Sequence, residues 1–329
     1  MASSATGPVI NRRIDPALDT RRLVLYFAGL IVFYGAVLLI TQPVLNGGEA
    51  ELNKFVIGVM LAPTVGAILA CVFGPGLIRF GMPSWWLLAA FLPAALVFLI
   101  TLVAAPISEA VTFHPDQVGA LLLMAVPQSL LGCIFALGEE IGWRGFLWPL
   151  MRRRLTFLAS TAIMFVVWWI YHAGLTLAGW YGFVGGIPAF TVALLGFVLF
   201  VGVLTERSRS IWPSVLAHGS WNALVATYFS SSGAGGGPGF TGSRYLLGEF
   251  GWLGAAGMLI LGVGSVWRHF RTPTKDGLSP KEPTGYESPV MWLWFRSTPS
   301  SRPQPRQRDI VLVWAGLALT AHRRVGCRL

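Results

Sequence analysis

Long apolar runs separated by short polar connections make up most of this 329-residue chain. A helix needs about 20 mainly apolar residues to cross the hydrocarbon core of a bilayer. Runs of this kind, which we predict to be spanning helices, cover residues 23–41, 55–74, 85–105, 118–138, 155–178, 187–205, 211–229 and 250–267. The pattern therefore predicts an all-α, polytopic membrane protein with about eight transmembrane helices.

The apolar runs divide the chain into three parts. We predict a polar N-terminal tail over residues 1–22, a transmembrane domain over 23–270 and a basic, Pro-rich tail over 271–329. A segment of the last composition buries too little apolar surface to fold, so we expect the C-terminal tail to be disordered. Its one apolar run, residues 310–319, is too short to span a bilayer and favours an interfacial segment.

The formal net charge of +10 raises the question of a nucleic-acid partner, but the distribution of charge argues against one. Residues 268–329 carry 11 Lys and Arg against 4 Asp and Glu, whereas the whole chain is 54% hydrophobic and only 12% charged. A basic segment next to a membrane span is attracted to anionic lipid headgroups. We therefore expect the bilayer, and no nucleic acid, as the partner of this charge.

Basic residues concentrate in alternate connections between the predicted spans. The connections on the N-terminal side hold Arg12, Arg13, Arg21, Arg22, Arg79, Arg144, Arg152, Arg153, Arg154, Arg207, Arg209, Arg268 and Arg271. The opposite connections hold only Lys54 and Arg244. Because cytoplasmic loops carry the excess of Lys and Arg, we predict that both termini are cytoplasmic. We expect a multi-pass protein of the cell membrane rather than of an internal membrane.

Two carboxylates and a guanidinium, those of Glu139, Glu140 and Arg144, interrupt the apolar pattern near the end of the fourth run. An ionisable residue at the bilayer centre costs at least ~2.5 kcal/mol and indicates a functional site. Glu140 and Arg144 are four residues apart and share a helix face, whereas Glu139 is rotated by ~100°. We predict that Arg144 holds Glu140 and that Glu139 is left for chemistry.

Two more pairs with the same spacing lie in later runs, namely Trp168 with His172 and His218 with Asn222. Helix rise places these pairs and Glu139 at depths that allow a shared, membrane-embedded cavity, which we expect to open toward the cytoplasm. There a carboxylate can take a proton from water, imidazoles can orient that water and an amide can donate to an oxyanion. This set of groups suits hydrolysis of an amide bond by activated water.

The three motifs together resemble a known family. Glu-Glu-x-x-x-Arg from Glu139, aromatic-x-x-x-His ending at His172 and His-x-x-x-Asn from His218 occur in this order in the CAAX protease and bacteriocin-processing (CPBP) family of intramembrane proteases, which includes the type II CAAX prenyl endopeptidases. The resemblance covers a core of about residues 118–229. One departure is Trp168, where the family pattern usually has Phe, and it bears on substrate preference.

The resemblance implies an intramembrane endopeptidase of the glutamate or metallo type. Its implied catalytic residues are Glu139 and His172, which activate water, and His218 and Asn222, which stabilise the transition state; Glu140, Arg144 and Trp168 support them. The implied substrate is a membrane-associated protein or peptide. A prenylated CAAX protein is the family's best-described target.

The use of a metal is left open by the residues. Glu139, His172 and His218 could bind Zn²⁺, but the same side chains could position a water molecule without a metal. The sequence contains no His-Glu-x-x-His motif and no Gly-x-Ser-x-Gly motif, and its aspartates all lie in tails or loops. Zinc proteases with the first motif, serine hydrolases with the second and intramembrane aspartyl proteases are therefore excluded.

Other functions compatible with these residues are a transporter and a scaffold. Glu139 could relay protons in a proton-coupled transporter, although no duplicated halves of the kind found in transporters occur in the chain. A catalytically silent scaffold could keep the same fold. Taken singly, the Glu140–Arg144 pair could be a structural ion pair, and His218 and Asn222 could join neighbouring helices.

Overall fold

The computed structural model describes residues 16–41, 49–73, 78–81, 85–228 and 239–272. Its first elements are α1 (Pro16–Thr41), α2 (Glu49–Val72), η1 (Trp85–Phe91), α3 (Leu92–Ala104), β1 (Val111–Phe113), η2 (Pro115–Gln117), α4 (Val118–Gly142), the π-helix η3 (Trp143–Leu147) and α5 (Trp148–Arg152). They are followed by α6 (Phe157–Leu177), η4 (Val184–Gly186), α7 (Ile187–Ser208), α8 (Trp212–Ser220), the π-helix η5 (Trp221–Tyr228), β2 (Phe240–Gly242) and α9 (Trp252–Arg271).

Within the described residues, seven helices are long and apolar enough to cross a membrane. They coincide with seven of the predicted runs, which confirms an all-α polytopic membrane protein. The remaining run, residues 211–229, is divided between α8 and η5. The backbone changes from α to π at Trp221, so neither piece alone reaches the length of a span. The prediction of eight spans is therefore approximate.

Helix α1 begins at Pro16, earlier than the predicted start of the first span at residue 23. Asp19 accounts for the extra turns because its carboxylate lies 2.8 Å from the Arg22 guanidinium and 2.7 Å from that of Arg153. Part of the predicted N-terminal tail is therefore helical. Residues 1–15 and the predicted C-terminal tail from residue 273, including its interfacial segment, lie outside the described residues.

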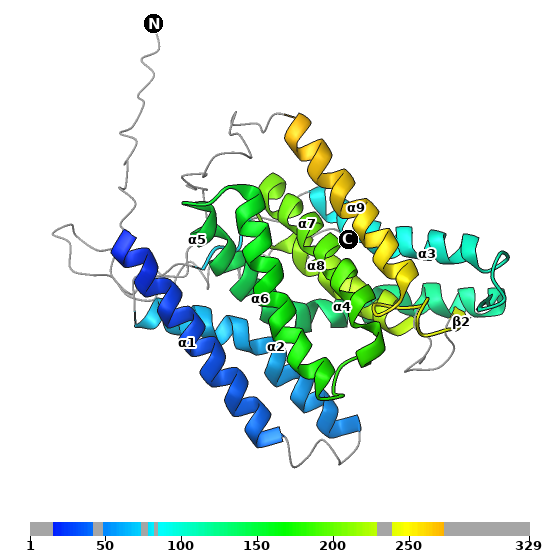
Figure 1. The fold of residues 1–329 in the computed structure, drawn as a ribbon, viewed down its shortest axis with the longest axis horizontal. Coiled ribbons are helices and arrows are strands. Elements are labelled where there is room, and N and C mark those ends of the chain that lie inside the picture. The colour runs from blue at the N-terminus through cyan, green and yellow to red at the C-terminus, as the bar shows by residue number, and fades with distance from the viewer. Residues whose placement is uncertain (1–15, 42–48, 74–77, 82–84, 229–238, 273–329) are drawn as a thin grey trace, which may run out of the picture. The chain divides into compact units, whose positions relative to one another are not determined.

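The helices that carry the motifs belong to one bundle, in which α4 packs against α8 and α7 packs against both α6 and α8 (Figure 1). Helix α4 packs between α2 and α8, and α7 packs against α6 and α9. Close approach depends on small residues, as is usual between membrane helices. A Cβ atom at Gly142 would lie 2.3 Å from the backbone of Pro63, and one at Gly219 would lie 2.5 Å from the Cys133 nitrogen. Gly219 thus brings His218 close to α4.

A short two-stranded sheet joins the connection before α4 to the connection before α9. Strands β1 and β2 pair antiparallel, with Thr112 opposite Thr241. The rings of Phe113 and Phe240 lie 5.1 Å apart, and Phe240 is fully buried. The sheet was not predicted from the sequence, because two three-residue strands carry no periodic signal of their own. It anchors the segment that leads to α9.

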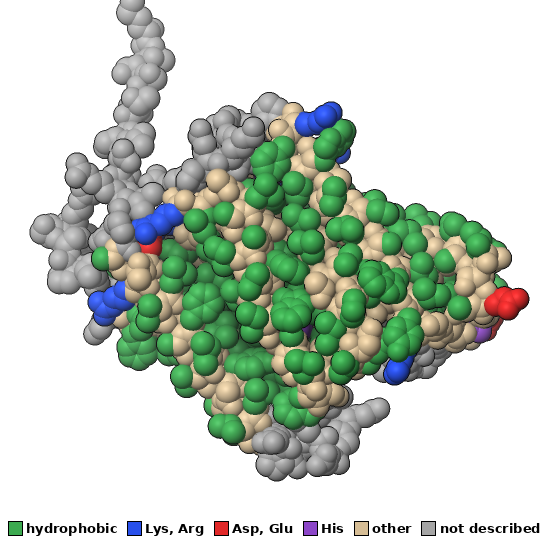
Figure 2. All heavy atoms as spheres, viewed as in Figure 1, with side chains coloured by type: hydrophobic (Ala, Val, Ile, Leu, Met, Phe, Trp, Pro, Cys, Tyr) green, Lys and Arg blue, Asp and Glu red, His purple; other side chains and the backbone are tan. Residues whose placement is uncertain are grey.

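The outer surface of the bundle is apolar. Large side chains such as Leu39, Leu123, Ile134 and Ile170 are more than 60% exposed. Figure 2 shows one face covered mainly by hydrophobic side chains, with charged groups at its margins. This distribution is the reverse of that in a water-soluble protein, and it fits a surface in contact with lipid tails.

Candidate active site

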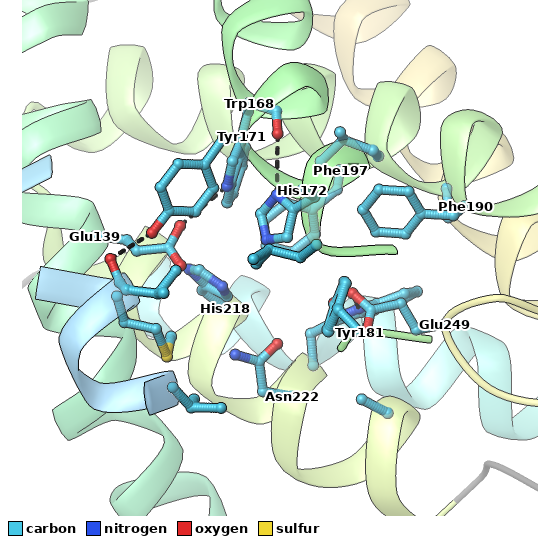
Figure 3. Close-up of a pocket in the computed structure, with 18 of the residues that line it drawn as sticks. Glu139, Trp168, Tyr171, His172, Tyr181, Phe190, Phe197, His218, Asn222 and Glu249 are labelled. Carbon is cyan, nitrogen blue, oxygen red and sulfur yellow. Dashed lines mark hydrogen bonds between the residues drawn. The ribbon is translucent and has the colours of Figure 1, made fainter. Parts of the chain in front are cut away.

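A cavity of about 220 Å³ brings together the four predicted catalytic residues. Glu139 from α4, His172 from α6, His218 from α8 and Asn222 from η5 all line it, together with Trp168 (Figure 3). Segments separated by up to 83 residues in the chain therefore meet at one place. The predicted cavity is present, and its polar groups lie within walls that are mainly aromatic and aliphatic.

Glu139 is held by two indole groups. Its Oε2 atom accepts a hydrogen bond from Nε1 of Trp143 at 3.0 Å and another from Nε1 of Trp168 at 2.9 Å. The residue is 2% exposed. Both hydrogen bonds found on this carboxylate among the described residues go to the same oxygen. The arrangement fixes the carboxylate at the cavity wall and leaves Oε1 for another partner.

The two tryptophans occupy positions that can be related to the sequence motifs. Trp143 stands one helical turn after Glu139, at the i,i+4 spacing that places both side chains on one helix face. Trp168 occupies the position where the resembled family usually has Phe. A phenylalanine ring has no N–H group, so the departure adds a hydrogen-bond donor to Glu139 that the usual residue cannot supply.

Glu140 contacts two side chains, those of Arg144 and His218. The helical spacing predicted the first of these contacts. The Oε1 atom of Glu140 lies 3.0 Å from Nη1 of Arg144, which confirms the predicted pair. The same oxygen lies 3.1 Å from Nδ1 of His218, a contact that links α4 to α8. Glu140 and Arg144 are 0% and 1% exposed, so they form a support behind the cavity wall.

Arg144 is only partly satisfied by hydrogen bonds. Its Nε and Nη2 atoms, like Oε2 of Glu140, have no hydrogen-bond partner among the described residues. Its guanidinium carbon instead lies 4.3 Å from the centre of the Trp168 ring, a distance suited to a cation–π interaction. Arg144 therefore supports both His218, through Glu140, and the indole that holds Glu139.

His172 presents one defined ring nitrogen to the cavity. Nδ1 lies 2.9 Å from the backbone carbonyl oxygen of Trp168, one turn earlier in α6. A carbonyl oxygen only accepts, so Nδ1 carries the hydrogen and Nε2 of the neutral ring is an acceptor. The ring packs against Tyr171 and Tyr181, with centroid distances of 5.0 and 5.3 Å. These neighbours hold the imidazole at the cavity wall.

Two π-helices lie next to the site. Helix η3 begins at Trp143, directly after α4 has placed Glu139 and Glu140, and η5 begins at Trp221, between His218 and Asn222. A π-turn inserts an extra residue into a helix and is frequent at functional sites. The half-buried Asn222 lines the same cavity as His218 despite this change of helical period.

The side chains that could bind zinc do not form a metal site as they are arranged. Among the described residues, no group of three or more His, Cys, Asp and Glu side chains could hold a metal ion. Nδ1 of His218 is engaged by Glu140, and Nδ1 of His172 by a backbone carbonyl. Each ring therefore keeps Nε2 for another partner, and zinc binding by Glu139, His172 and His218 stays a prediction.

The cavity extends away from the arginine-rich end of the bundle. Its lining includes Phe55 near the start of α2, Trp180 and Tyr181 after α6, and Glu249 before α9. These positions share one end of the bundle, which we call the far end; the Arg152 to Arg154 cluster marks the other. The lining therefore extends toward the far end, and the side of the membrane to which the cavity opens stays a prediction.

Buried side chains fill the interior of the bundle at its arginine-rich end. Arg152 is 0% exposed, and its Nε lies 2.9 Å from the Glu206 carboxylate, which also accepts a hydrogen bond from Trp148 at 3.1 Å. This buried ion pair and the large indole fill the interior below the site. Their partners lie 54 and 58 residues apart in the sequence, so no local pattern predicts the contact.

A comparison with protein families gives one match. Residues 118–224 match the model described as Type II CAAX prenyl endopeptidase Rce1-like. The segment begins with α4, ends within η5 and includes all seven predicted site residues. The resemblance drawn from the three motifs is thereby confirmed over this segment. No curated protein matches the chain.

Proposed function

Starting from the Rce1-like match of residues 118–224, we propose that this protein is an intramembrane endopeptidase that uses water activated by Glu139. The observation that carries the proposal is the common cavity of Glu139, His172, His218 and Asn222. A general base, a second acceptor and two groups able to act as donors are the parts that amide hydrolysis requires.

The proposed reaction begins with a water molecule between Glu139 and His172. Oε1 of Glu139 accepts a proton from the water while its oxygen attacks the carbonyl carbon of the peptide bond. Nε2 of His172, an acceptor in the neutral ring, orients the second hydrogen of the water. The two indoles on Oε2 keep the carboxylate in place, so that Oε1 is the oxygen that receives the proton.

The tetrahedral intermediate carries a negative oxygen that needs donors. Asn222 can supply its amide N–H, and His218 can supply Nε2–H when the ring is doubly protonated, because Nδ1 is engaged by Glu140. Collapse of the intermediate breaks the C–N bond. Glu139 then returns its proton to the leaving amine, which regenerates the carboxylate.

The substrate that fits this site is a membrane-associated protein or peptide. The cavity is enclosed by helices that span the membrane, and its walls are mainly apolar. Such walls suit a lipidated or strongly apolar segment. Following the matched family, we propose a prenylated CAAX-type protein or peptide as the substrate class.

The proposal is tested by cleavage of a farnesylated peptide with the purified protein, analysed by mass spectrometry. Glu139→Gln should abolish cleavage. Glu109→Gln is the matched control, because Glu109 is an exposed carboxylate outside the cavity. Proton-coupled flux that depends on Glu139, with no hydrolysis of any peptide by the parent protein, would instead support a transporter. The absence of both activities would support a silent scaffold.

A further inference from the structure

A second carboxylate, that of Glu249, lines the cavity at the far end. It accepts a hydrogen bond from Nε1 of Trp221 at 3.2 Å and lies close to Tyr181. Burial, together with the adjacent Glu249, raises the pKa of Tyr181, so the hydroxyl stays protonated. Both partners are neutral, and they hold the carboxylate without cancelling its charge.

The surroundings of Glu249 contain no matching positive charge among the described residues. None of the described residues that line the cavity is Lys or Arg, and no ion pair between described residues includes Glu249. A carboxylate in a largely apolar wall gains free energy when a cation binds next to it. An anionic group at the same place would be repelled.

Aromatic rings complete the surroundings of this carboxylate. The ring of Tyr181 lies 5.2 Å from that of Phe250 and 5.9 Å from that of Phe190, and Trp180 and Trp221 also line the cavity. The faces of such rings attract ammonium and guanidinium groups, more strongly where water is excluded. Carboxylate and rings thus favour the same kind of ligand.

Glu249 lies close to the proposed reaction centre. The Tyr181 ring is 5.3 Å from the His172 imidazole and also adjoins Glu249, so one side chain separates the carboxylate from a proposed catalytic residue (Figure 3). A peptide bound with its scissile bond near Glu139 would place a neighbouring residue beside Glu249.

We propose that Glu249, Tyr181 and Trp221 form a recognition subsite for a positively charged group of the substrate, either a lysine or arginine side chain or a free amine. The subsite rests on the proposed function and gives it a charge preference. If Glu249 had a purely structural role, in which it only positions Trp221 and Tyr181, the enzyme would show no preference that depends on the charge of Glu249. A glutamine would keep an acceptor for both donors and remove only the charge.

The test uses farnesylated peptides that differ only at one position within four residues of the prenylated cysteine, occupied by Lys, Leu or Glu. For the parent protein we expect kcat/KM to be about tenfold higher for Lys than for Leu at the best position. Glu249→Gln should bring this ratio close to one, mainly through KM for the Lys peptide. Glu249→Lys should reverse the preference in favour of the Glu peptide.

Two controls separate charge recognition from structure. Glu109→Gln should leave the Lys-to-Leu ratio unchanged, and thermal unfolding of Glu249→Gln should match that of the parent protein. A parent ratio near one, or a ratio that Glu249→Gln does not alter, would overturn the subsite. A loss of stability in Glu249→Gln with an equal loss for all three peptides would assign Glu249 a structural role instead.

A binding measurement distinguishes failure of the subsite from failure of the endopeptidase. The affinities of the three peptides are measured by tryptophan fluorescence with Glu139→Gln protein, with and without Glu249→Gln. Binding that favours Lys and depends on Glu249 would support the subsite even if the parent protein cleaved no peptide. Equal affinities for the three peptides would overturn it, whatever the parent protein cleaves.

Discussion

Trp168 donates its indole N–H to Oε2 of Glu139 at 2.9 Å, and so joins the aromatic-x-x-x-His motif directly to the Glu-Glu-x-x-x-Arg motif. Trp143, one helical turn after Glu139, donates to the same oxygen at 3.0 Å. Hydrogen bonds to an ionised carboxylate contribute about 1.5–3 kcal/mol each. The two indoles therefore fix one oxygen of Glu139 strongly and define which oxygen is available to a substrate or water.

Trp168→Phe tests this relationship. The change keeps an aromatic ring but removes the N–H donor, so Trp143 alone holds Oε2 of Glu139, and we expect kcat/KM to fall by about tenfold or more. Trp169→Phe is the matched control, because Trp169 donates to Thr191 outside the catalytic set. Peptide-cleavage kinetics measure both variants. Equal activity in Trp168→Phe and the parent protein would contradict a positioning role for this indole.

Arg144→Ala should lower stability as well as activity. It leaves the carboxylate of Glu140 buried with only His218 as its partner, and breaking a buried pair in this way costs about 3–5 kcal/mol. Thermal unfolding in detergent provides the measurement. Arg154→Ala is the control, because its side chain is 34% exposed and a surface pair with Asp19 contributes little. An unchanged melting temperature with lost activity would place Arg144 in the chemistry instead.

Glu139→Gln and His172→Ala should be strongly non-additive. Each alone should reduce kcat by about 10²- to 10⁴-fold, because each removes one side of the same water site. The double variant should be little worse than the poorer single variant, since residues that act as a unit lose their effect together. Single-turnover cleavage assays on the four proteins measure this coupling. Losses that multiply would show that the two residues act independently.

The topology remains a prediction that follows from the arginine distribution. Reporter fusions placed in residues 179–186 and 229–249 should report the non-cytoplasmic side, and fusions at either terminus should report the cytoplasm. A cytoplasmic signal from either internal fusion would contradict the arrangement with both termini inside.

Most of the fold follows from patterns that are local in the sequence. The span of α6 was predicted within two residues at its start and one at its end, because lipid requires an uninterrupted apolar helix. The i,i+4 rule also predicted the contact between Glu140 and Arg144. The divided span at α8 and η5 was not predicted, because a π-turn leaves the apolar composition unchanged.

The parts of the site that sequence reasoning missed depend on contacts between distant segments. Glu249 lies 28 residues from Trp221, in a connection whose polar residues look like those of any exposed loop. His218 and Glu140 are 78 residues apart, and their contact follows from the close approach of α4 and α8 at Gly219. Trp143 did have a local signal, its i,i+4 spacing from Glu139, which indicates a neutral donor as readily as a basic one.

The extension of the cavity toward Glu249 has a consequence for proton exchange. Ionisable groups equilibrate with the water that reaches them, and the buried Arg152–Glu206 pair fills the opposite end of the interior. If the arginine-rich end faces the cytoplasm, as its charge predicts, Glu139 and His172 take their protons from the external medium. Activity in sealed vesicles would then follow the acidity of that compartment and be insensitive to a shift of cytoplasmic pH.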